Sequence, residues 1–126
     1  MFSTNSFLGY NYVSKFIFAV NDICQKYNKK DFKLTIQFSL DGPAWLNEQS
    51  RKAGATQKTI DTIDEILDKI NPENFKYSLM ITSKITLSTL HMKEMVEDSK
   101  LMKEYFDFFN NFKKRENKNN YIETYF

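Results

Sequence analysis

The sequence predicts an α/β fold in which parallel strands are joined by helices. Helical and strand-like patterns alternate along the chain in the order helix, strand, helix, strand, helix. Right-handed crossover connections between parallel strands produce this alternation. The 126 residues suffice for one domain with a substantial core, and neither an internal repeat nor a low-complexity tract indicates a second domain.

The composition narrows the class of protein. With 12 Phe and 7 Tyr the chain is too aromatic for a disordered protein, and a net charge of +2 is too small to indicate nucleic-acid or anionic-membrane binding. The single cysteine, Cys24, excludes an internal disulfide and a multi-cysteine metal site. The chain shows no signal-peptide pattern and no apolar run near the length of about 18 residues that a membrane span needs. We therefore expect a soluble, cytoplasmic protein.

The first half of the chain predicts one helix and one strand. Residues 2–6 have the pattern of a strand end, and apolar residues then recur with helical spacing over 12–27, at Val13, Phe16, Ile17, Val20, Ile23 and Cys24. A strand is predicted over 33–39, where apolar Leu34, Ile36 and Phe38 alternate with polar Thr35, Gln37 and Ser39. Asp41-Gly42-Pro43 predicts a turn, because proline cannot continue a strand ladder.

The second half predicts three helices around one more strand. Thr56 is the expected N-cap of a helix that ends at Asn71-Pro72, and the alternating run KYSLMITSKITL then predicts a strand. Ser88 is expected to cap the next helix. The candidate core residues of the last two helices are Leu90, Met92, Met95, Leu101, Met102, Tyr105, Phe106, Phe109 and Phe112. We expect a domain core over 1–98, with a C-terminal helix and frayed tail of the same domain over 99–126.

The run from Ile36 to Arg51, IQFSLDGPAWLNEQSR, resembles radical SAM (S-adenosylmethionine) enzymes. In that superfamily the fourth strand of a TIM-like (β/α) barrel ends in Ser-Leu-Asp-Gly-Pro, and an arginine follows before the next helix. Ser39 to Pro43 match, Arg51 stands at the expected distance, and Asn47-Glu48 replaces the commoner His-Asp. Thr4-Asn5 is similar to the Thr-Asn-Gly that closes the third strand. The resemblance covers about 95 residues and implies a partial barrel containing strands three to five.

The resemblance also implies cofactors that this chain cannot hold alone. The Cys-x3-Cys-x2-Cys loop that ligates a [4Fe–4S] cluster in this superfamily is not in the sequence. The parent activity would be reductive cleavage of S-adenosylmethionine to a 5′-deoxyadenosyl radical that abstracts a substrate hydrogen. We expect the chain alone to be inactive. Its expected partners are the cofactor, a complementary chain that carries the cluster loop, and a peptide or small-molecule substrate.

By the same resemblance, Ser39 would hydrogen-bond the cofactor and Arg51 would bind its methionine carboxylate. The other candidate cofactor-binding residues are Asn5, Asp41, Gln37, Thr82 and Lys84. The strand pattern supports part of this set independently, since Thr35, Gln37, Ser39 and Asp41 share one face that ends at the carboxyl end of the strand. Sites in parallel barrels form at that end.

Structural alternatives remain open for these residues. Asp41 is also suited to capping backbone amides in a turn, and Arg51 to a surface ion pair with Glu48. The alternative function is a noncatalytic α/β module that binds a protein partner through the Phe-rich C-terminal helix. Another barrel enzyme is disfavoured because no Gly-rich phosphate loop is present. Under either reading, unpaired edges of a parallel sheet predict association.

Overall fold

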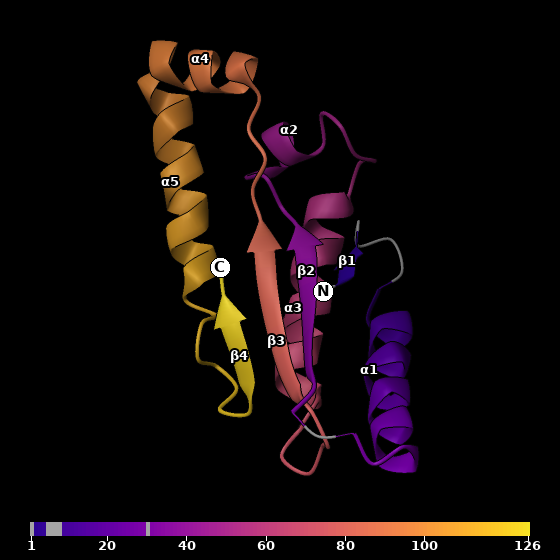
Figure 1. Ribbon diagram of the computed structural model, residues 1–126. Coiled ribbons are helices and arrows are strands. Elements are labelled where there is room, and N and C mark those ends of the chain that lie inside the picture. The colour runs from indigo at the N-terminus through magenta and orange to yellow at the C-terminus, as the bar shows by residue number, and fades with distance from the viewer. Residues whose placement is uncertain (1, 5–8, 30) are drawn as a thin grey trace.

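The computed structural model describes residues 2–4, 9–29 and 31–126, and its four strands form one sheet (Figure 1). In both sequence and space the strands follow the order β1 (Phe2–Thr4), β2 (Lys33–Ser39), β3 (Ser78–Lys84) and β4 (Ile122–Tyr125). All three pairings are parallel. The predicted α/β class with a parallel sheet is therefore confirmed. The described sheet is open and ends at β1 and β4, so a closed barrel is not present.

Helices make every connection between neighbouring strands. They are α1 (Gly9–Lys26), α2 (Ala44–Asn47), α3 (Ala55–Lys69), α4 (Thr89–Glu97) and α5 (Ser99–Lys113). The predicted cap of α4 is confirmed, since the Ser88 hydroxyl accepts a hydrogen bond from the amide of His91 at 3.2 Å. None of the helices in the described part of the chain is long and apolar enough to cross a membrane.

The predicted N-cap of α3 is wrong by two residues. Gly54, not Thr56, precedes the helix, and its left-handed backbone (φ 84°) suits a residue without a side chain. Thr56 lies in the first turn instead. Glu48 from the preceding loop accepts hydrogen bonds from the amides of Gly54 and Thr56. A carboxylate outside the helix therefore caps it.

One face of the sheet is buried under the helices. The apolar side chains predicted for that face, Leu34, Ile36, Phe38, Leu79 and Ile81, belong to one core cluster with residues of α1, α3 and α5. The C-terminal part of the chain is tied to α3 by an ion pair between Arg115 and Asp64 at 2.6 Å. The amide of Asn119 also donates to the carbonyls of Leu67 and Ile70. The three long helices therefore share one side of the sheet.

The opposite face of the sheet, here called the open face, is polar. In Figure 1 no helix lies in front of β2 and β3 on this side. Only Met80 and Tyr125 are large and apolar among its described side chains, which are Lys33, Thr35, Gln37, Ser39, Ser78, Met80, Thr82, Lys84, Glu123 and Tyr125. The alternation predicted for the two central strands is thus confirmed.

The C-terminal tail is ordered, which corrects the expectation that it frays. Ile122 and Thr124 alternate inward in β4, and the amide of Phe126 donates to Glu116 at 2.9 Å. The ring of Phe126 packs on Phe112 with centroids 4.8 Å apart. Four alternating residues after a polar loop are too few to indicate a strand by pattern, and pairing with β3 supplies the missing stability.

Several expected core positions are exposed. Leu90 and Met92 of α4, Phe106 of α5, and Phe16 and Ile23 of α1 face outward, whereas Met95, Phe109 and Phe112 are buried as expected. α4 is a short helix beyond the carboxyl end of the sheet (Figure 1), so only one side of it meets the rest of the domain.

The role of β4 can be tested by mutation. Ile122 is 4% exposed and its neighbour Tyr121 is 51% exposed. Ile122→Ala should lower the free energy of unfolding by about 2–4 kcal/mol, because it leaves a cavity in the core. Tyr121→Ala should change it by less than about 0.5 kcal/mol. Urea denaturation measures both, and equal effects would show that β4 does not belong to the cooperative fold.

Candidate functional site

The predicted site lies where β2 ends and the loop to α3 begins. Leu40 extends the sheet by one residue, since its amide donates to the carbonyl of Lys84 at 3.0 Å. The next residues turn toward α2 beneath the aromatic ring of Tyr105 from α5. A side chain at Gly42 would lie 3.2 Å from that ring, so glycine permits the close approach of α5 to the loop.

Arg51 is held at the carboxyl end of β2 by a partly buried hydrogen-bond network. Its Nη1 donates to Asp41 Oδ2 at 2.6 Å, to Asn47 Oδ1 at 2.8 Å and to the Asn47 carbonyl at 3.2 Å. The other carboxylate oxygen of Asp41 accepts from the amide of Thr86 at 2.9 Å. Asp41 therefore joins the loop after β2 to the loop after β3 and neutralises Arg51.

Asn47 connects this network to the start of α3. Its side chain is fully buried, accepts from the amide of Asp41 at 3.0 Å, and donates to the Thr56 hydroxyl at 2.9 Å. The hydroxyl of Thr56, together with the amides of Gly54 and Thr56, holds the pKa of Glu48 below its ordinary value of 4.5. Hydrogen bonds from Asn47 and Glu48 thus link the end of β2, through this loop, to the start of α3.

The register of the sheet brings four of the predicted residues together. Gln37 pairs with Thr82 and Ser39 pairs with Lys84, so two polar rows cross the open face at its carboxyl end. The Thr82 hydroxyl is buried without a hydrogen-bond partner among the described residues. Ser39 is half-buried and Lys84 is exposed, so the row that they form, and not the buried Thr82 hydroxyl, is accessible to a polar ligand.

The contacts of Asp41 and Arg51 decide between the structural alternatives given for these two residues. Asp41 does cap a backbone amide, that of Thr86. Arg51 forms its ion pair with Asp41 and not with Glu48. Asn5, the remaining predicted cofactor-binding residue, lies outside the described residues. His91 is near Gln49, with Nε2 2.5 Å from the side-chain oxygen, and so belongs to the rim of α4.

Two residues at the site were not predicted from the sequence. Asn47 was noted only as a replacement in the family pattern, yet it makes the central contacts of the loop. No local pattern indicated these contacts, because Asn47 is the last residue of α2 and Arg51 lies in the loop beyond it. Tyr105 is remote in sequence. Burial, and secondly the charge of Asp41, raise its pKa, and no local pattern indicated this contact.

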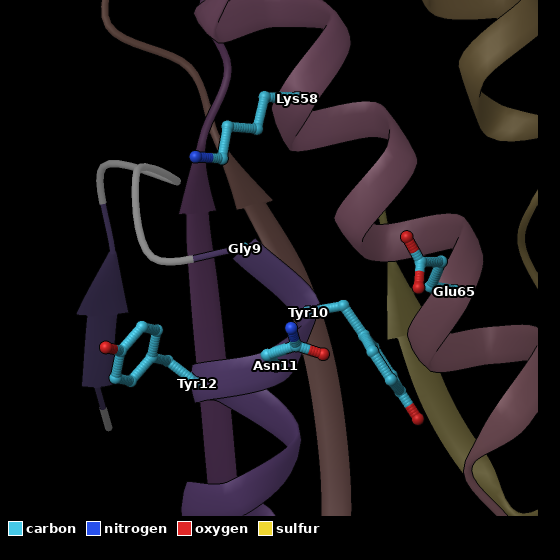
Figure 2. Close-up of a pocket in the computed structure, with 6 residues that line it drawn as sticks. All are labelled: Gly9, Tyr10, Asn11, Tyr12, Lys58 and Glu65. Atoms are coloured by element: carbon cyan, nitrogen blue, oxygen red, sulfur yellow. The ribbon is translucent and has the colours of Figure 1, made fainter.

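A separate pocket of about 350 Å³ lies in the helix layer and not on the open face. Figure 2 shows its lining at the start of α1 and along α3, from Gly9, Tyr10, Asn11, Tyr12, Lys58 and Glu65. It contains none of the predicted cofactor-binding residues.

The described residues contain no group of three His, Cys, Asp or Glu side chains that could hold a metal ion. Cys24 is free and buried in the core. No protein-family model, curated protein or solved structure matches the chain.

The cap formed by Glu48 predicts a pH dependence of stability. Because its pKa is lower in the folded than in the unfolded chain, its contribution is complete at neutral pH. That contribution is lost as the pH falls below 4.5 and through the folded pKa. Glu48→Gln should therefore be less stable than the wild type near neutral pH. It should also lose less stability on acidification to about pH 3.

Urea denaturation at a series of pH values measures this difference. The matched control is Glu97→Gln, which changes an exposed glutamate at the end of α4. Parallel pH profiles for the wild type and Glu48→Gln would contradict a capping role for Glu48.

Proposed function

We propose that this chain binds S-adenosylmethionine as part of a radical SAM barrel whose iron–sulfur cluster is held by another polypeptide. The single observation that carries the proposal is the fixed position of Arg51 beside the carboxyl end of β2. A partly buried ion pair and two hydrogen bonds to Asn47 order this arginine before any ligand binds. Such preorganisation lowers the entropy cost of binding a carboxylate.

The arrangement of the sheet supports the same proposal. Parallel strands in sequential order, with the long helices on one side and a polar face on the other, are what a segment of a (β/α) barrel would require. In that setting the open face would line the interior. Half-buried Ser39 and exposed Lys84 lie at the carboxyl end of that face, where a ribose-bearing ligand needs hydrogen-bonding partners.

Arg51 retains a second edge for a ligand. Its hydrogen bonds to described residues all use Nη1, so the edge formed by Nε and Nη2 is the one that we assign to the methionine carboxylate. In this assignment Asp41 positions Arg51 through the ion pair and does not touch the ligand. When bound and reduced, S-adenosylmethionine supplies the radical; the residues of this chain bind and orient it.

The described residues do not fit an iron–sulfur cluster, because no set of metal ligands is present among them. The cluster therefore belongs to a complementary chain in this proposal, and no step of the reaction is assigned to the 126 residues alone.

The alternative function, a protein-binding module that uses the C-terminal helix, has less support. Phe109 and Phe112 of α5 are buried in the domain and Phe108 packs against its core. Phe106 is the residue of this aromatic run that is exposed. Most of the aromatic residues of α5 are therefore explained by packing within the fold.

Ligand titration by calorimetry tests the proposal. The wild type should bind S-adenosylmethionine more tightly than 5′-methylthioadenosine, which lacks the methionine carboxylate and amine. Arg51→Ala should reduce this preference by about tenfold or more, which corresponds to one charge-assisted interaction. Lys33→Ala, at the amino end of the same open face, should leave the preference unchanged.

Arg51→Ala also removes the partner of a buried carboxylate, so its fold is checked by circular dichroism. Ser39→Ala provides a second variant, since it removes a half-buried hydroxyl outside the Asp41 network and should weaken binding without unfolding the chain. Absence of binding by the folded wild type at about 1 mM ligand would overturn the proposal, as would an unchanged preference in folded Arg51→Ala.

A further inference from the structure

Asn47 is the uncharged side chain of the network that holds Arg51. It is fully buried, so its contacts are with the protein and not with a ligand. Its Oδ1 accepts from the amide of Asp41 at 3.0 Å and from Arg51 Nη1 at 2.8 Å, and its Nδ2 donates to the Thr56 hydroxyl at 2.9 Å. Any influence of Asn47 on ligand binding therefore acts through Arg51.

The partners of Asn47 fix the orientation of its amide. The backbone amide of Asp41 and the guanidinium of Arg51 can only donate, so the atom that faces them must be an acceptor. On the other side, the Thr56 hydroxyl also bonds Glu48 and thereby holds the pKa of that carboxylate below its ordinary value. An ionised carboxylate can only accept, so the hydroxyl donates its hydrogen to Glu48 and accepts from Asn47. Position 47 thus requires an acceptor on one side and a donor on the other, which an amide supplies.

The contacts at Nη1 also fix the direction of the rest of the guanidinium. This nitrogen donates to Asp41 Oδ2 at 2.6 Å, to Asn47 Oδ1 at 2.8 Å and to the Asn47 carbonyl at 3.2 Å. The guanidinium is planar and rigid, so acceptors on one of its nitrogens determine where its opposite edge points. Asn47 therefore aims the edge of Arg51 that we assign to the ligand.

The charge of this network depends on the neutrality of Asn47. Asp41 supplies one negative charge to Arg51, and Asn47 supplies further acceptors without a second charge. An aspartate at position 47 could place an oxygen at the same point. Two carboxylates on one guanidinium would, however, leave a net negative charge that repels an anionic ligand. An asparagine orients Arg51 and keeps the site open to a carboxylate.

We infer that Asn47 is a positioning residue that determines the specificity of the Arg51 site for a ligand carboxylate. It orients the guanidinium through an uncharged oxygen, so Arg51 is fixed before binding and can still take an anionic partner. The identity of the ligand rests on the proposed function. The orientation of Arg51 by Asn47 is a property of the chain alone, so it can be measured without a ligand.

NMR of the arginine side chains tests the orienting contact directly. Arg51 and Arg115 are the two arginines of the chain, so the guanidinium spectrum contains signals from these two residues alone. Asn47→Ala removes a side-chain acceptor at Nη1 of Arg51. Exchange between the two Nη signals of Arg51, which reports rotation of the guanidinium, should become faster by about tenfold or more. Arg115 binds Asp64 through Nε and Nη2 and is the internal control, so its exchange should not change.

Asn47→Asp provides a second variant with a different expected result. Asn47→Ala leaves the amide of Asp41 without its partner and is expected to lower stability, so the fold of both variants is checked by circular dichroism. Asn47→Asp retains an acceptor for Arg51, and guanidinium rotation should therefore remain as slow as in the wild type.

Calorimetric titration of Asn47→Asp tests the charge argument. The reference ligand is decarboxylated S-adenosylmethionine, which keeps the sulfonium and the amine and lacks only the carboxylate. The variant should lower the preference for S-adenosylmethionine over this compound by about tenfold or more, because its added carboxylate opposes that of the ligand. Asn74→Asp is the matched control. It adds the same charge to an exposed loop between α3 and β3, at the amino end of the sheet, and should leave the preference unchanged.

The two measurements separate this inference from the proposed function. A folded Asn47→Asp with the wild-type preference would overturn the inference, as would unchanged rotation of Arg51 in a folded Asn47→Ala. Absence of binding by the wild type would instead overturn the proposed function and the ligand assigned with it. The NMR comparison would still decide whether Asn47 orients Arg51.

Discussion

The buried amide of Asn47 is the contact on which the carboxyl end of the sheet depends. It accepts from the backbone at the end of β2, accepts from Arg51, and donates to the first turn of α3. A fully buried amide that lost one partner would leave a donor or acceptor unsatisfied, at a cost of about 1–3 kcal/mol. In the observed conformation of the loop between strand and helix, the Asn47 amide has partners on both its oxygen and its nitrogen. The position of Arg51 follows from it.

The two carboxylates of the loop, Asp41 and Glu48, make different contacts. Asp41 and Glu48 are both carboxylates within the same short segment, yet Asp41 neutralises Arg51 whereas Glu48 caps α3. Each is held by several donors, and neither contributes to a metal site among the described residues. Through these hydrogen bonds the two carboxylates hold the loop between β2 and α3 against its neighbours.

The elements with strong local patterns could be predicted from the sequence, and those that depend on distant contacts could not. β2, β3 and the buried stripe of α3 follow from alternation and helical spacing, which act within one segment. β4 is too short to be recognised alone and exists because β3 pairs with it and Phe126 packs on Phe112. The same reason explains the site. Ser39 and Arg51 stand out in a motif, whereas the contact of Tyr105 with the loop requires knowledge of where α5 lies.

The composition of the open face limits the kind of partner that it can bind. The open face has two large apolar side chains among its described residues, so burying it against a protein would desolvate hydroxyls, amides and charges for little hydrophobic gain. A polar small molecule that supplies matching hydrogen bonds avoids that cost. The composition of the open face therefore favours a small polar ligand over a protein partner.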